Sequence, residues 1–239
     1  MLPARRIDLP GQRGMKREDG FAQAGFVLTA PLLAWSDWPE VAAALAQLAD
    51  TGAGTRNLLE LDWCARLATY LRAHQALAPL LPFEAVAVQC TLFEKSAAQN
   101  WLVPLHQDLS IPVQERRDHP ELGGWSTKEG ALFVQAPPAL LAQMVAVRLQ
   151  IDPGGEHDGA LRVVPGSHLH GRLSAQAVSA ARERGGEIIC PVPPGAAMVM
   201  RPLLLHASAK ASGSSRRRVL HYLFGPRELP CQLQWRHAR

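Results

Sequence analysis

Two residues near the middle of the chain, His106 and Asp108, have the types and the spacing of metal ligands. Side chains two positions apart point to the same side of an extended backbone, so this imidazole and this carboxylate would converge. Two histidines and one carboxylate form the facial triad that holds Fe(II) and leaves coordination positions open. The pair alone is weak evidence, because the chain has nine histidines and an H-x-D sequence often arises by chance. The prediction therefore depends on a third ligand further along the chain.

His206 is the candidate third ligand. It lies in the apolar run 203–208, which we expect to be a strand, and Arg217 follows eleven positions later. A lone histidine on such a strand is more often a core residue. We expect two antiparallel strands, joined by a polar loop at 209–215, to bring His206 and Arg217 together. Arginine suits a carboxylate, because its planar guanidinium donates two parallel hydrogen bonds and stays charged. Ser208 shares the face of His206 and could donate one more hydrogen bond.

These residues would supply a metal site beside a clamp for an anionic co-ligand. A bidentate oxo acid would take two open positions on the metal, and O2 the last. Because Asp108 is retained, no position is vacant for a halide, and oxygen insertion is favoured over halogenation. A rival metal pair, His168 and His170, lies at a turn with glycines around it, which favours a structural role. In a cupin-like enzyme that used this pair, replacing His168 by alanine would abolish metal binding.

Short apolar runs separated by glycine and proline predict the fold class. The chain has 239 residues, of which 19 are glycine and 19 are proline, and 47% are hydrophobic, so a sizeable core is available. We expect a mainly β protein with flanking helices (α+β), arranged as a jelly-roll sandwich or barrel with N-terminal helices packed outside. Residues 1–20 are polar and basic, which predicts a flexible lead, and residues 21–239 would form a single domain.

Capping signals and periodicity place the elements. Apolar spacing predicts helices at 39–51, 59–73 and 174–184, and alternation predicts strands at 83–93, 145–151, 187–192, 196–201, 203–208 and 217–224. On the strand at 83–93 we place Val86, Val88, Cys90 and Leu92 on one face, and Ala87, Gln89, Thr91 and Phe93 on the other. The polar pair on the second face would border either a cavity or solvent.

The stretch of roughly 35 residues after Asp108 is expected to be a long functional loop, such as a lid. Trp125 and Lys128 could line a substrate pocket there, or could belong to a plain packed loop. On the next strand, Arg148 lies on the face opposite Val147 and is a third candidate for contact with the substrate.

Composition and charge limit the kinds of partner and compartment that we expect for this protein. The net charge is +4, which suits a small anionic ligand better than duplex nucleic acid, where a broad basic face is expected. The four cysteines form no C-x-x-C pair and are expected to be reduced. No apolar run reaches the roughly 18 residues of a membrane span, and no secretory signal is evident, so we expect a cytoplasmic protein without membrane contact. Monomer and homodimer remain equally open.

As a set, these motifs resemble a known family. His106-Gln107-Asp108, the run Gly159-Ala-Leu-Arg-Val-Val-Pro-Gly-Ser-His168, His206-Ala207-Ser208 and Arg217 are similar to the phytanoyl-CoA dioxygenase (PhyH) family of Fe(II)/2-oxoglutarate-dependent oxygenases, which includes ectoine hydroxylase. The similarity covers about residues 83–224, and the N-terminal third matches loosely. Phe93 stands where ectoine hydroxylases have an asparagine, which argues against ectoine as the substrate.

The resemblance implies a double-stranded β-helix core and a role for each motif residue. His106, Asp108 and His206 would hold the iron, and Arg217 with Ser208 would bind the far carboxylate of 2-oxoglutarate. Gln89 would be a further co-substrate contact. Among the arginines at 216–218, strand parity favours the middle one.

The implied activity is hydroxylation of a C–H bond of a small molecule, with consumption of O2 and 2-oxoglutarate and release of succinate and CO2. One alternative is a catalytically silent member that binds or senses a ligand, against which the intact set of residues speaks. Another is nucleic-acid demethylation, against which the mild charge speaks. The substrate, and whether it is free or linked to CoA or a carrier, stays open.

Overall fold

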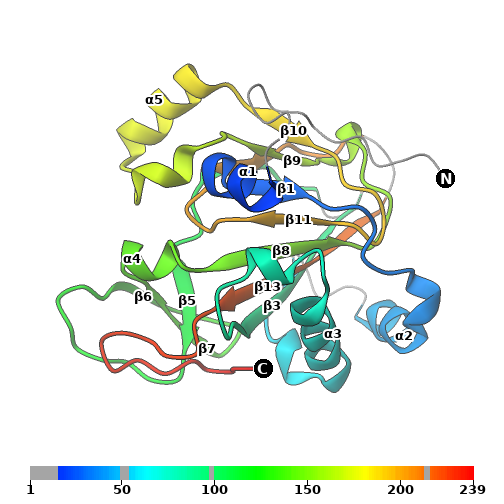
Figure 1. The fold of residues 1–239 in the computed structure, drawn as a ribbon, viewed down its shortest axis with the longest axis horizontal. Coiled ribbons are helices and arrows are strands. Elements are labelled where there is room, and N and C mark those ends of the chain that lie inside the picture. The colour runs from blue at the N-terminus through cyan, green and yellow to red at the C-terminus, as the bar shows by residue number, and fades with distance from the viewer. Residues whose placement is uncertain (1–15, 49–53, 97–99, 213–215) are drawn as a thin grey trace.

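The computed structural model describes residues 16–48, 54–96, 100–212 and 216–239. Within these ranges the chain forms two main antiparallel sheets and a smaller third one, with helices packed around them (Figure 1). The expected class, mainly β with flanking helices in a jelly-roll arrangement, is confirmed. None of the described helices is long and apolar enough to cross a bilayer.

The strands of the two main sheets are mostly short, as predicted. In spatial order, the larger sheet contains β1 (Phe26–Leu28), β11 (Ala197–Met200), β8 (Val145–Gln150), β13 (Arg217–Gly225), β3 (Val86–Lys95) and β2 (Gly54–Thr55). The smaller sheet contains β10 (Ile188–Cys190), β9 (Leu161–Val163), β12 (His206–Ser208) and β4 (Val103–His106). Strands that are distant in the sequence are therefore neighbours in space, as in a jelly roll.

Helices surround the sheets (Figure 1). They are α1 (Arg17–Ala24), α2 (Pro39–Gln47), α3 (Asp62–Ala73), α4 (Pro138–Leu141) and α5 (Ala175–Gly185), with 3-10 turns η1 (Trp35–Asp37), η2 (Leu58–Glu60), η3 (Ala78–Leu80), η4 (Glu156–Asp158) and η5 (Ser167–His170). The three predicted helices are present, although the second begins later because 58–60 form a 3-10 turn. Ser174 caps α5 by accepting a hydrogen bond from the Ala177 amide at 3.2 Å. The boundary expected at residue 20 falls inside α1, and residues 1–15 lie outside the described ranges.

Two apolar clusters hold the layers together. The outer cluster packs α2 and α3, through residues such as Leu45 and Leu67, against the outward face of the larger sheet, where Leu149 and Tyr222 lie. The inner cluster joins the two main sheets and contains Met198, Met200, Leu161 and Val163. Six of the nine buried polar residues in the described chain line one inner cavity, namely Thr91, Lys95, His206, Ser208, Arg217 and His221.

A β-bulge in β3 overturns one prediction. The register between β3 and β13 shifts so that Val88 is an extra residue without a partner. Val86 and Val88 therefore pack in the inner cluster, whereas Cys90 and Leu92 pack in the outer one. The prediction that these four share a face is wrong, because a bulge reverses the alternation along the strand. After the bulge, Gln89 and the alternate residues that follow it face the cavity.

The stretch after Asp108 is a sheet rather than a long loop. It forms β5 (Ser110–Val113), β6 (Gly123–Lys128) and β7 (Ala131–Gln135) in the spatial order β5-β7-β6. A two-residue turn of Glu129 and Gly130, both at positive φ (50° and 75°), joins β6 to β7. Positive φ at both central residues is typical of a tight hairpin turn whose twist matches that of the flanking strands. The hairpin places the end of β6 beside the cavity.

Candidate active site

A cavity of about 430 Å³ lies between the two main sheets and the third sheet. It brings together all but one of the nine residues that the sequence singled out: His106, Asp108, His206, Arg217, Ser208, Gln89, Lys128 and Arg148 line it. The exception is Trp125, whose ring lies 5.4 Å from the guanidinium of Arg116 and packs against the inner core. Its predicted place in the pocket is wrong, because its side chain packs against the inner core, whereas Lys128 on the same strand lines the cavity.

His106 and His206 are cross-strand neighbours on β4 and β12, with ring centroids 4.2 Å apart. Asp108 follows β4. Its Oδ1 lies 3.6 Å from Nε2 of His106, and its Oδ2 lies 3.7 Å from Nε2 of His206. One ligand atom from each of the three residues lies within 4.8 Å of the others. The three groups thus surround a space into which one metal ion would fit.

Backbone carbonyls orient both imidazoles. Nδ1 of His106 donates to the carbonyl of Pro104 at 2.8 Å, and Nδ1 of His206 donates to the carbonyl of Leu204 at 2.9 Å. A neutral imidazole whose Nδ1 carries the proton presents a free lone pair on Nε2, which is the form that binds metals. The side chain of Gln107 is hydrogen bonded to the backbone of Leu203 and Leu173, so it anchors the segment that holds Asp108.

Burial and neighbouring charges set the protonation of these groups. Burial lowers the pKa of His206 to about 4. Burial alone would raise the pKa of Asp108, but the neighbouring imidazoles outweigh it and hold this pKa below its usual range. Burial alone would lower the pKa of His106, but the carboxylate of Asp108 and the carbonyl of Pro104 together outweigh it and raise this pKa. An ionised carboxylate and a neutral His206 are the forms that metal binding requires.

His221 on β13 lies beside the three metal-ligand candidates. Its Nε2 is 4.0 Å from the Asp108 carboxylate, and its Nδ1 accepts a hydrogen bond from Arg148 at 2.8 Å. Burial, and then repulsion from Arg148, lower the pKa of His221 to about 3. Arg148 also stacks on Phe93, with 5.4 Å between guanidinium and ring centroid. Arg148 is therefore held in place at the wall of the cavity.

The rival histidine pair is not part of a three-ligand group in the part of the chain that the structure describes. Nε2 of His168 donates to the carbonyl of Ala22 at 3.0 Å and so attaches η5 to α1. A second group of potential ligands, His119, Glu121 and Cys231, lies where the C-terminal segment meets the loop before β6. None of its members lines the cavity.

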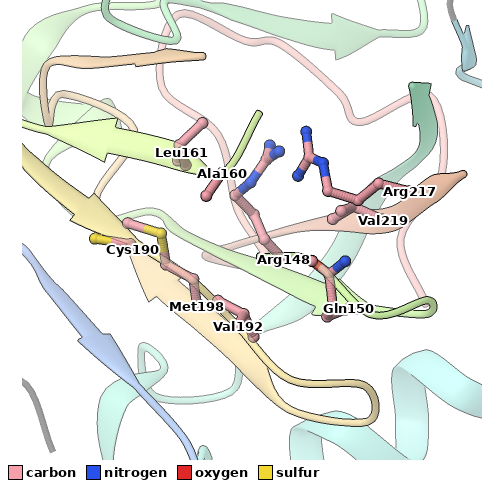
Figure 2. Close-up of a pocket in the computed structure, with 10 residues that line it drawn as sticks. Arg148, Gln150, Ala160, Leu161, Cys190, Val192, Met198, Arg217 and Val219 are labelled. Carbon is pink, nitrogen blue, oxygen red and sulfur yellow. The ribbon is translucent and has the colours of Figure 1, made fainter. Parts of the chain in front are cut away.

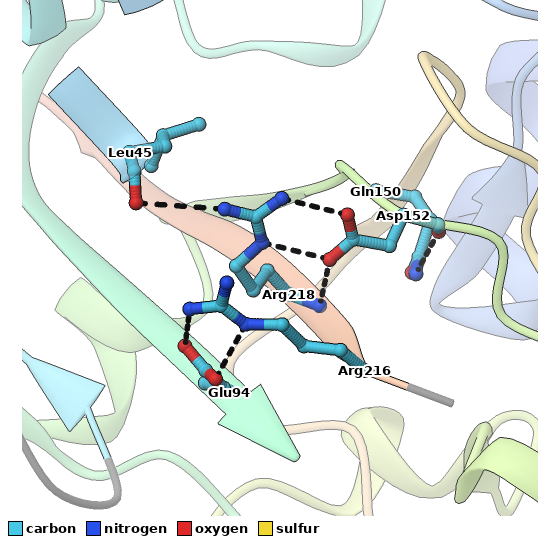
Figure 3. Close-up of polar contacts among 6 residues, drawn as sticks. All are labelled: Leu45, Glu94, Gln150, Asp152, Arg216 and Arg218. Carbon is cyan, nitrogen blue, oxygen red and sulfur yellow. Dashed lines mark hydrogen bonds and ion pairs between the residues drawn. The ribbon is translucent and has the colours of Figure 1, made fainter. Parts of the chain in front are cut away.

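Only the middle arginine of the run at 216–218 lines the cavity. Arg216 makes two hydrogen bonds to Glu94 at 2.6 and 2.9 Å, and Arg218 makes two to Asp152 at 2.8 Å each, both outside the cavity (Figure 3). Arg217 is 6% exposed, and its Nε is buried without a hydrogen-bond partner. A buried donor without a partner is costly, so this guanidinium is suited to an anionic ligand.

The predicted route that brings His206 and Arg217 together is wrong. They do not lie on a hairpin, because β12 belongs to the four-stranded sheet and β13 to the six-stranded sheet. They line the same cavity from opposite sides of the jelly roll. The eleven-residue spacing reflects a connection that crosses between sheets, which the sequence alone does not distinguish from a hairpin.

Sequence reasoning missed Lys95, the last residue of β3, which is buried and lines the cavity. Its Nζ donates to Ser208 Oγ at 2.6 Å and to the carbonyl of Ala209 at 2.5 Å. The signal was present, because Lys95 continues the inward alternation of Gln89, but the strand was expected to end two residues earlier. Lys128 also lines the cavity, with Nζ 5.0 Å from the centroid of the Phe133 ring.

Solved structures share this fold at low sequence identity. SnoK, a non-haem α-ketoglutarate-dependent carbocyclase from nogalamycin biosynthesis, is 13% identical with a TM-score of 0.64, over 89% of this chain and 85% of that one. HygX from Streptomyces hygroscopicus, solved with nickel and 2-oxoglutarate bound, is 20% identical with a TM-score of 0.58, over 89% and 88%. EctD from S. alaskensis is 16% identical with a TM-score of 0.64, over 93% and 84%.

The family assignment comes from the sequence profile of the phytanoyl-CoA dioxygenase (PhyH) family, which matches residues 40–219. No curated protein was found to match the chain. The matched region is most of the chain and includes the metal-ligand candidates and Arg217. The chain therefore belongs to the phytanoyl-CoA dioxygenase family and is a non-haem oxygenase that depends on iron, 2-oxoglutarate and O2.

Proposed function

We propose that this enzyme hydroxylates a C–H bond of a small molecule held in the 430 Å³ cavity, with release of succinate and CO2. His106, Asp108 and His206 hold the Fe(II). Arg217 and Gln89 bind 2-oxoglutarate in the cavity that Ser208 also lines. One observation carries the proposal: three metal-ligand groups and a buried guanidinium with an unsatisfied Nε line the same enclosed space.

The donor set fits the metal and the co-substrate. Two imidazole nitrogens and one carboxylate oxygen on one side leave the other coordination positions open, which is the pattern of non-haem Fe(II) oxygenases. The unsatisfied Nε of Arg217 fits a carboxylate that arrives with the co-substrate. When bound, the iron supplies O2 activation coupled to the oxidative decarboxylation of 2-oxoglutarate.

The chain's own residues orient and shield the reactants. The carbonyls of Pro104 and Leu204 fix the imidazoles so that each Nε2 faces Asp108. Apolar side chains that include Trp101, Phe133 and Leu223 form part of the cavity wall and limit the access of water. Lys128 and Arg148 are positioned to contact a substrate that carries an anionic group.

The proposal also specifies the outcome of the reaction, which is hydroxylation. Among similar folds, SnoK is described as a carbocyclase and SnoN as an epimerase, so the same fold serves other outcomes in those proteins. The carboxylate of Asp108 leaves no ligand position for a halide, which favours hydroxylation over halogenation. Product mass distinguishes the outcomes, since hydroxylation adds one oxygen atom, ring closure removes two hydrogens and epimerisation changes neither.

An anaerobic titration tests the cofactor assignment. Addition of Fe(II) and then 2-oxoglutarate to the apo-protein should give a visible metal-to-ligand charge-transfer band. His206→Ala should abolish the band, and His168→Ala, its matched control outside the cavity, should keep it. If well-folded wild-type protein gives no band, the silent ligand-binding alternative replaces the proposal. A substrate screen scored by succinate release then identifies the reaction.

A further inference from the structure

Lys95 is the most deeply buried cation of the cavity. It is 2% exposed and lies at the end of β3, where it is the cross-strand partner of Arg217 on β13. Its two hydrogen bonds within the described chain go to uncharged oxygens of Ser208 and Ala209. A buried ammonium normally has a carboxylate partner, because desolvation of an unpaired charge is costly. Among the described residues no carboxylate is hydrogen bonded to Lys95, so its position calls for an anion from a ligand.

The hydroxyl of Ser208 is already engaged. Ser208 Oγ donates to the carbonyl of Gly159 at 2.7 Å and accepts from Lys95 at 2.6 Å. A hydroxyl has a single hydrogen, so in this arrangement Ser208 has none left for a ligand carboxylate. The ammonium of Lys95 has three N–H donors and uses two, so one remains for a ligand. Lys95 thus offers the hydrogen bond that was expected from the serine.

Positive charge is concentrated at this end of the cavity. Arg217 and Arg148 extend into one shared space, and a small cavity of about 10 Å³ lies beside their side chains (Figure 2). Burial, and then repulsion from Arg217 and from Arg148, lower the pKa of Lys95 to about 8. An anion bound between Lys95 and Arg217 would relieve this repulsion and satisfy the unpaired Nε of Arg217.

We propose that Lys95 and Arg217 together bind the distal carboxylate of 2-oxoglutarate, and that Lys95 is the residue that selects a dicarboxylate co-substrate. The inference rests on the proposed function, since it assumes that the 2-oxo acid end binds the iron. It adds Lys95, on β3, to Ser208 on β12 and Arg217 on β13, which were the residues expected at this carboxylate. Ser208 then acts indirectly, by fixing the direction of the Lys95 side chain.

Two 2-oxo acids that differ in one group provide the test. 2-Oxoglutarate and 2-oxobutyrate chelate iron through the same 2-oxo carboxylate, but only the first has a distal carboxylate. The Kd of each is measured anaerobically with Fe(II)-loaded protein from the charge-transfer band, in wild type, Lys95→Met and Lys95→Gln. Lys210→Met, which removes an exposed lysine two residues after Ser208, is the matched control.

We expect Lys95→Met to weaken 2-oxoglutarate on the order of 10- to 100-fold, the scale of a lost charge-assisted hydrogen bond, and to leave 2-oxobutyrate unchanged. Lys95→Gln should lie between Lys95→Met and wild type, and Lys210→Met should match wild type for both acids. Unchanged 2-oxobutyrate binding also shows that the variant is folded and holds iron. Only a selective loss supports the inference.

The other outcomes separate the two proposals. If wild type gives a band and Lys95→Met binds 2-oxoglutarate as tightly, the inference is wrong and the proposed function stands. If Lys95→Met weakens both acids equally, Lys95 supports the metal site rather than the distal carboxylate, and the inference is again wrong. If wild type gives no band with either acid, the proposed function fails and the inference fails with it.

Discussion

Replacement of Lys95 by methionine should make the metal-free protein more stable. The ammonium is buried with two other cations nearby, and its pKa falls from the ordinary 10.5 to about 8. At 1.36 kcal/mol per pKa unit, this shift of about 2.5 units corresponds to roughly 3 kcal/mol of destabilisation at pH 7. Methionine removes the charge and keeps a side chain of similar length, but it loses hydrogen bonds to Ser208 and Ala209, worth about 1 kcal/mol each. The net gain should be about 1–2 kcal/mol.

The pH dependence identifies the cause. Because the folded pKa lies below the unfolded one, the unfolded chain binds more protons between pH 8 and pH 10.5, and wild-type stability rises with pH across that window. Below pH 8 the full penalty is present. The advantage of Lys95→Met should therefore be constant below pH 8 and should shrink as the pH rises towards 10.5.

Urea unfolding at pH 7 and pH 9.5, with a chelator and without 2-oxoglutarate, measures this difference in unfolding free energy. Addition of metal and 2-oxoglutarate should reverse the order, because only wild type gains the contact between Lys95 and the distal carboxylate. Lower stability of Lys95→Met at pH 7, or an advantage that does not change with pH, would refute the argument that Lys95 is a strained buried cation.

Three further predictions concern other features. Gly159 has φ +71°, and a Cβ there would come within 2.7 Å of a backbone carbonyl, so Gly159→Ala should lower the unfolding free energy by about 1–3 kcal/mol in urea titrations. Cys231 is the least buried of the four thiols, and burial raises the pKa of Cys190 to about 12, so native protein should show a single accessible thiol with a disulfide reagent. Burial and the nearby Glu121 raise the pKa of Cys231 as well, so this thiol should react more slowly than free cysteine. Arg56 donates to both carboxylate oxygens of Glu129 at the β6–β7 turn, so Arg56→Met should cost at most about 1 kcal/mol but speed amide exchange at residues 128–131.

The local part of the candidate site could be predicted from the sequence. His106 and Asp108 converge because their spacing fits an extended backbone, and the strand that carries His206 is a clear apolar run. The choice of Arg217 within the run at 216–218 also followed from strand alternation, and the carboxylates of Glu94 and Asp152 account for its two neighbours. Each of these predictions needed only the geometry of one short segment.

The predictions that failed needed long-range information. The bulge at Val88 depends on the register between β3 and β13, which lie about 130 residues apart in the sequence. The sequence predicts a loop where the third sheet lies, because β5 and β6 are short and a nine-residue connection separates them. Trp125 was misplaced for the same reason. Lys95 was missed because a lysine at the end of a strand usually reaches solvent, and only the tertiary structure buries it.

The two halves of the candidate site lie on different sheets. His106 and His206 belong to the four-stranded sheet, whereas Lys95 and Arg217 belong to the six-stranded sheet. A co-substrate that chelates a metal on one sheet and pairs with cations on the other would act as a cross-brace between two layers that otherwise meet mainly through apolar contacts. The loaded enzyme should accordingly unfold with both sheets opening together rather than separately.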